Sequence, residues 1–233
     1  MTMVLIVVAV VSGALVLGAA WGIYGSLSTK TEGFLVALAG GALLLSVVTE
    51  LIEPSVEETS LLAAVIGVAI GAIVFSVVDY AIKEKMDSSG GAGLLAAITL
   101  DGIPENLALG VALIGAGAPE VAALAGSILL SNLPEAAGGA KDMASGRSKG
   151  RVLALWAATA AILSLAAVAG NVFLAEASDT TLGTIRCIAA GAVIASLATE
   201  VFPKAYREND YWTGIATALG VLLALALGEL GGG

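Results

Sequence analysis

The stretch GALLLSVVTE at residues 41–50 returns 150 residues later as GAVIASLATE at residues 191–200. Five positions are identical, and in both copies a proline follows the glutamate within four residues. The identical positions are Gly41, Ala42, Ser46, Thr49 and Glu50, which match Gly191, Ala192, Ser196, Thr199 and Glu200. Self-similarity at a fixed spacing indicates an internal repeat. We therefore expect two structurally related parts in this chain.

The composition around this repeat is that of a membrane protein. Of 233 residues, 58% are hydrophobic and only 12% are charged, whereas soluble domains carry roughly 25% charged residues. Eight apolar runs approach the length of about 20 residues that crosses a bilayer. They cover residues 4–24, 33–52, 61–82, 94–114, 121–140, 152–175, 182–202 and 211–227. The prediction is an all-α polytopic membrane protein of eight transmembrane helices, forming a single domain.

Basic residues predict the orientation, because cytoplasmic loops accumulate Lys and Arg. Nine of the ten Lys and Arg residues follow odd-numbered runs, and Arg186 is the exception. We therefore expect an integral protein of the plasma membrane with both termini outside. The second and seventh runs then cross in opposite directions, so their repeat is inverted. Inverted repeats are typical of secondary transporters, which work by alternating access.

A second repeat lies in the fourth and fifth runs. LDGIPENLALG at residues 100–110 aligns with LSNLPEAAGGA at residues 130–140, with a shared Pro-Glu pair. These two runs are also expected to be inverted relative to each other. Pro104 and Pro134 each free the carbonyl four residues earlier. In lipid such a carbonyl needs a neighbour, water or an ion as its partner.

The acids of this second repeat are the candidate metal ligands. Asp101 and Glu105 are four residues apart and share one helix face. A charged side chain at mid-membrane depth costs roughly 2.5–3.5 kcal/mol and suggests an ion path. An alternative is that kinked helices hold protonated acids against carbonyls without transport. The predicted ligands are Asp101, Glu105, Ser131, Asn132 and Glu135, and the candidates for a gate or a secondary metal position are Glu50, Glu200, Asn106 and Asp142.

The missing residue types restrict the chemistry. The chain has no histidine and one cysteine, Cys187, so a metal site must be built from oxygen and no internal disulfide forms. Oxygen ligands suit Mn, Mg or Ca and still accept Fe(II) or Zn. A net charge of -9 argues against a nucleic-acid partner. We expect a divalent metal as substrate, no organic cofactor, and metal release coupled to proton uptake on Glu105 or Glu135.

The motifs DGIPEN at residues 101–106 and SNLPEA at residues 131–136 resemble the ZIP (Zrt/Irt-like) family of divalent metal transporters. In that family the fourth helix carries HNxPEG and the fifth carries HExPHE or QDxPEG. The resemblance implies eight helices with both ends outside, an elevator-like movement, a homodimer and a preference for zinc. Asp101 stands where the family has histidine, Gly102 where it has asparagine, and Ser131 and Asn132 replace other ligands. We therefore expect one bound metal rather than two, and Mn or Fe(II) as plausible as Zn.

Two other functions are compatible with parts of the sequence. The missing histidines would also suit a non-transporting membrane scaffold or sensor derived from a transporter. Asp79 and Asp101 would be the acid pair of an intramembrane aspartyl protease, but that reading leaves the Pro-Glu repeat unexplained. We therefore expect a transporter and not an enzyme.

Overall fold

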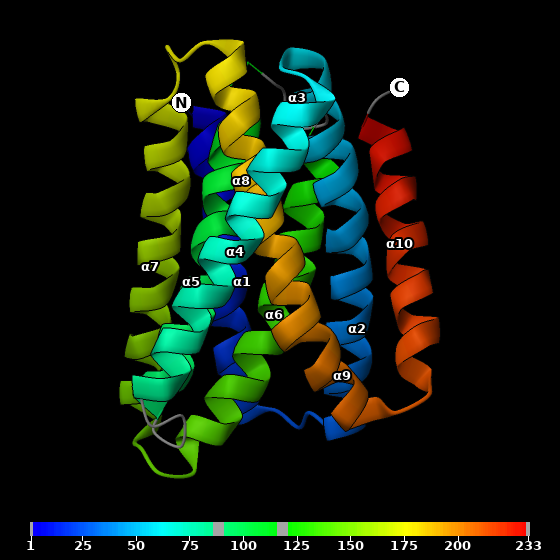
Figure 1. Cartoon of the computed structure of the whole chain (residues 1–233). Helices are drawn as coiled ribbons and strands as arrows, with labels where there is room; N and C mark the ends of the chain where they lie inside the picture. Colours follow the sequence, from blue (N-terminus) through cyan, green and yellow to red (C-terminus); the bar gives the residue numbers. More distant parts are fainter. Residues whose placement is uncertain (1, 86–90, 116–120, 232–233) are drawn as a thin grey trace.

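The computed structural model describes residues 2–85, 91–115 and 121–231, with only the backbone described at 85, 91–98, 101, 230 and 231. The described residues form helices and no strands (Figure 1). The helices are α1 (Thr2–Tyr24), α2 (Thr29–Ser46), α3 (Glu53–Glu58), α4 (Leu61–Lys85), α5 (Gly91–Ala112), α6 (Ala122–Ala144), α7 (Lys149–Phe173), α8 (Asp179–Ser196), α9 (Phe202–Asn209) and α10 (Trp212–Gly231). The π-helical segments η1 (Val47–Ile52) and η3 (Leu197–Val201) join α2 to α3 and α8 to α9.

The chain is an all-helical membrane protein. In the described residues, six helical stretches are long and apolar enough to span a bilayer: α1, α2 through α3, α4, α7, α8 through α9, and α10. Their outer surfaces are apolar, as at Leu62 and Ile73 of α4, which are 70% and 63% exposed. α6, which carries the polar SNLPEA motif, is not among the six. The fully described part of α5, which carries DGIPEN, is too short to be judged by this criterion.

The second and seventh apolar runs, which end at residues 52 and 202, are each followed by further helix. The helical path continues through Pro54 to Glu58, and through Pro203 to Asn209. A proline inside an α-helix clashes with the carbonyl four residues earlier. Here each proline follows a π-helical turn and lies in the first turn of the next helix, where its missing N–H is tolerated.

The two copies of the 41–50 repeat adopt the same local structure. Ser28 caps α2 by accepting a hydrogen bond from the Thr31 amide at 3.1 Å, and Ser178 caps α8 by accepting one from Thr181 at 3.3 Å. A π-helical segment follows each helix at the same place. Both copies therefore begin and end alike.

The repeats also use their glycines in the same way. A Cβ on Gly41 would overlap the carbonyl oxygen of Thr217 in α10, and one on Gly191 would overlap that of Val68 in α4. Only glycine permits such close helix contact. Hence α2 packs tightly on α10 and α8 packs tightly on α4.

Helices α2 and α8 run in opposite directions. Figure 1 shows α3 at the end of the bundle that holds both termini, and α9 at the opposite end. We call these the α3 end and the α9 end. Because α2 leads into α3 and α8 leads into α9, the two helices are antiparallel.

α5 and α6, which carry the two Pro-Glu motifs, pack against other helices of the bundle. α6 packs mainly on α1 and α5 mainly on α7. A buried cluster joins them to the repeats, with Leu109 and Leu124 packed among Leu43, Val47 and Val193. This cluster holds α5 and α6 against the two copies of the 41–50 repeat.

Candidate metal site

Four of the five predicted ligands line one small cavity. Glu105 comes from α5, and Ser131, Asn132 and Glu135 come from α6. The remaining lining residues are Gly102, Leu163 of α7, Ser196 of α8 and Val201 of η3. The space open to the centre of a water molecule is ≈ 10 Å³, which is room for about one water or one bare cation.

α5 brings Glu105 to this cavity as a buried side chain, 7% exposed. Gly102, one turn earlier, lets α7 approach, because a Cβ there would lie 2.5 Å from Cδ1 of Leu163. Asp101 precedes Glu105 by four residues on the same helix. Its side chain lies outside the described residues, so its part in the site stays a prediction.

α6 supplies three cavity residues from one face. Ser131 and Glu135 are four residues apart, and Asn132 and Glu135 are three apart, which are the spacings of neighbours on a helix surface. Asn132 is 3% exposed, and its Nδ2 donates to the carbonyl oxygen of Val11 at 3.1 Å. This bond holds the Asn132 amide nitrogen against α1 and leaves the amide oxygen, Oδ1, pointing away from that contact.

Ser196 is a cavity residue that the sequence reasoning did not predict as a ligand. It is 2% exposed, and within the described part of the chain its hydroxyl has no hydrogen-bond partner. Its counterpart in the first repeat, Ser46, bonds the Ser127 hydroxyl at 3.0 Å. Ser196 is one of the residues that are identical in the two copies of the repeat. Its position beside the cavity results from tertiary packing, which the repeat does not predict.

These groups form an all-oxygen donor set with two carboxylates. A divalent cation would neutralise Glu105 and Glu135, and the hydroxyl and amide oxygens would complete its coordination. In the part of the chain that the structure describes, no three His, Cys, Asp or Glu side chains are grouped as a metal site. The site therefore rests on two described acids, with Asp101 as the predicted third.

Glu50 and Glu200, which end the two copies of the 41–50 repeat, lie outside the cavity. Glu50 accepts a hydrogen bond from the Leu124 amide at 2.8 Å, at the start of α6, where a negative charge is favourable. Glu200 pairs with Lys83, which also pairs with Asp79 at 3.0 Å. Neither glutamate lines the cavity, so a role as gate or secondary ligand stays a prediction.

The two remaining candidates are also away from the cavity lining. Asn106 is fully buried and its Nδ2 donates to the carbonyl oxygen of Gly102 at 2.9 Å. Asp142 is exposed near the C-terminal end of α6. Asn106 is thus held by its own helix, and Asp142 lies at the surface.

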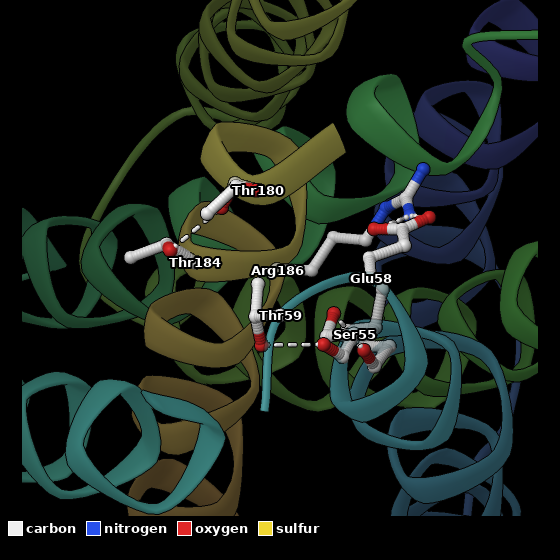
Figure 2. Close-up of polar contacts among 7 residues, drawn as sticks. Ser55, Glu58, Thr59, Thr180, Thr184 and Arg186 are labelled. Carbon is white, nitrogen blue, oxygen red and sulfur yellow. Dashed lines mark hydrogen bonds and ion pairs between the residues drawn. The ribbon is translucent and has the colours of Figure 1, made fainter. Parts of the chain in front are cut away.

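Arg186, the exception to the charge bias, is an internal residue rather than a loop charge. It is 8% exposed, and its Nη1 donates to Glu58 Oε1 at 2.7 Å and Oε2 at 2.9 Å. Figure 2 shows Arg186 of α8 extending to Glu58 of α3, beside the bond from the Thr59 hydroxyl to the Ser55 carbonyl. This ion pair links α8 to α3 at the α3 end of the bundle.

Replacing Glu58 by alanine should lower the melting temperature of the purified protein by several degrees. The guanidinium of Arg186 would lose a charge-assisted bond, worth about 1.5–3 kcal/mol. Glu57→Ala is the matched control, because Glu57 is an exposed neighbour on the same short helix. Equal shifts for the two variants would show that the pair adds nothing.

Comparisons with known proteins identify no family for this chain. No protein-family model matches this chain, and no characterised protein matches it.

Proposed function

We propose that this protein is a secondary transporter that moves a divalent metal cation across the membrane by alternating access. The observation that carries the proposal is the cavity between α5, α6 and α8. It combines two glutamates from the repeated Pro-Glu motif with serine and asparagine side chains, inside an apolar bundle. Carboxylates are expensive in such surroundings unless a cation or a paired charge accompanies them.

The repeats support alternating access. The second and seventh predicted runs share their caps, π-helical turns and close-contact glycines, and they run antiparallel (Figure 1). If α5 and α6 also cross the membrane, the bundle has eight spans arranged as inverted repeats. Such pseudo-symmetry allows one central site to be reached from either side.

The charge distribution supports a cytoplasmic α9 end. The loops after α1 and α6 lie there (Figure 1), and they are flanked by Lys30, Lys141, Arg147 and Lys149. Both termini then lie outside a plasma membrane, in agreement with the positive-inside rule. The buried pairing of Arg186 removes the one residue that opposed this orientation.

The resemblance to the ZIP family supports the same proposal. It would add a homodimer and an elevator-like movement. With no histidine in the chain, the donors favour a broad substrate range in which Mn and Fe(II) accompany Zn. A non-transporting scaffold or sensor remains the alternative. An aspartyl protease has less support, because Asp79 is paired with Lys83.

Metal flux into proteoliposomes tests the proposal. Vesicles containing the native protein should take up Mn²⁺, Fe²⁺ or Zn²⁺ in a saturable manner, faster than protein-free vesicles made from the same lipids. Uptake equal to that of protein-free vesicles for all three ions would contradict transport and favour the scaffold or sensor.

A further inference from the structure

A partly buried ion pair lies beside the cavity at the α9 end. Lys204 Nζ of α9 is 2.8 Å from Glu32 Oε1 of α2, and Glu32 is 6% exposed. The Glu32 carboxylate rests against α6 at Gly138, where a Cβ would overlap Oε1. Three helices therefore meet at this ammonium and carboxylate.

The pair is one helical turn from the cavity on two helices. Gly138 follows Glu135 by three residues, so both lie on one face of α6. Lys204 likewise follows Val201 by three residues, and Val201 lines the cavity. One turn of α-helix rises about 5.4 Å. The Lys204 side chain thus lies between the cavity and the α9 end of the bundle.

Charges connect this pair to the cavity and to the surface. Lys204 attracts Glu135 electrostatically, and Glu200 repels it. Toward the surface, Glu208 interacts with Lys204, Glu32 and the exposed Asp142. Lys204 is therefore a cation flanked by acids on the side of the cavity and on the side of the surface.

A transporter must also return empty, and an empty cavity leaves two glutamates without a metal. Carboxylates in a dry site need a compensating charge. Lysine carries its ammonium on a flexible four-carbon chain, long enough to cover about one helical turn. Rotation of this chain can move the ammonium from Glu32 toward Glu135 while the backbone of α9 stays in place.

We propose that the Lys204 ammonium takes the place of the metal, pairing with Glu135 when the cavity is empty and with Glu32 when a metal is bound. This inference rests on the proposed transport function. It makes Lys204 a residue of the return step: net uptake requires the empty protein to return, whereas exchange of metal for metal requires only the loaded protein to cross.

Two flux measurements on Lys204→Met test this inference, with Mn²⁺ as the probe. Net uptake into metal-free vesicles should fall roughly tenfold, a factor that losing one charge-assisted hydrogen bond would produce. Exchange of labelled for unlabelled Mn²⁺ should stay close to the native rate. Lys141→Met is the matched control, because Lys141 lies at the same end and donates to the Leu27 carbonyl; both of its rates should be native.

Unchanged net uptake, or equal losses of net uptake and exchange, would overturn the role of Lys204. If the single variant does not fold, the double variant Glu32→Gln/Lys204→Met replaces it, because it removes both charges and leaves no unpaired buried carboxylate. The double variant should likewise lose net uptake and keep exchange close to the native rate. Failure of the native protein to show either flux would instead contradict the proposed function itself.

Discussion

Metal uptake by the Glu135→Gln and Glu105→Gln variants should fall about 10- to 100-fold, the cost of losing a well-placed metal-site group. Each substitution keeps the size of the side chain and removes one negative charge from the cavity. A divalent ion would then meet one carboxylate instead of two, in a site too small to hold a large hydration shell. The loss should appear in both net uptake and exchange, because binding precedes both.

The matched control for these variants is Glu53→Gln. Glu53 is an exposed acid at the start of α3, so its neutralisation should leave uptake unchanged. Size-exclusion profiles and melting temperatures of the three variants would verify that they fold. Native uptake in both cavity variants would show that these glutamates do not bind the transported ion.

The second large effect concerns stability. Gly191→Ala should destabilise the protein by about 1–3 kcal/mol or more, the usual cost of overpacking, because the added Cβ would overlap the carbonyl oxygen of Val68. The neighbouring atom is backbone, so the whole of α4 or α8 would have to shift. Transport should fall as well, since α8 also carries Ser196 at the cavity.

Gly13→Ala provides the opposite expectation. Gly13 lies inside α1 and a Cβ there would meet nothing within 4 Å. Alanine at an unobstructed helical position is favoured over glycine by roughly 0.5–1 kcal/mol. Melting curves should therefore shift down for Gly191→Ala and slightly up for Gly13→Ala. Downward shifts of the same size in both would refute the close contact between α8 and α4.

The helical architecture and the repeat could be predicted from local pattern. Gly41 and Gly191 mark the same position in α2 and α8, and the structure gives both the same kind of close contact. The gathering of Glu105, Ser131, Asn132 and Glu135 around one cavity agrees with helical spacing and the shared proline. Within each helix these features depend on residues a few positions apart, whereas the meeting of α5 and α6 at the cavity depends on how the helices pack.

The partners of the charged residues could not be predicted in this way. Glu50 and Glu200 occupy equivalent positions of the repeat, yet Glu50 bonds a backbone amide of α6 and Glu200 bonds Lys83 of α4. Lys204 lies just beyond the seventh predicted run and Arg186 lies within it, and both are paired with acids of other helices. Such contacts join residues more than 70 positions apart and are fixed only when the helices pack.

Bound metal in the purified protein tests the central proposal most directly. Elemental analysis after equilibration with Mn²⁺ and removal of free ion should give one metal per native chain. Glu105→Gln/Glu135→Gln should retain almost none, and Glu53→Gln should match the native protein. Native protein without bound metal, or equal metal in the double variant, would contradict a metal site at this cavity.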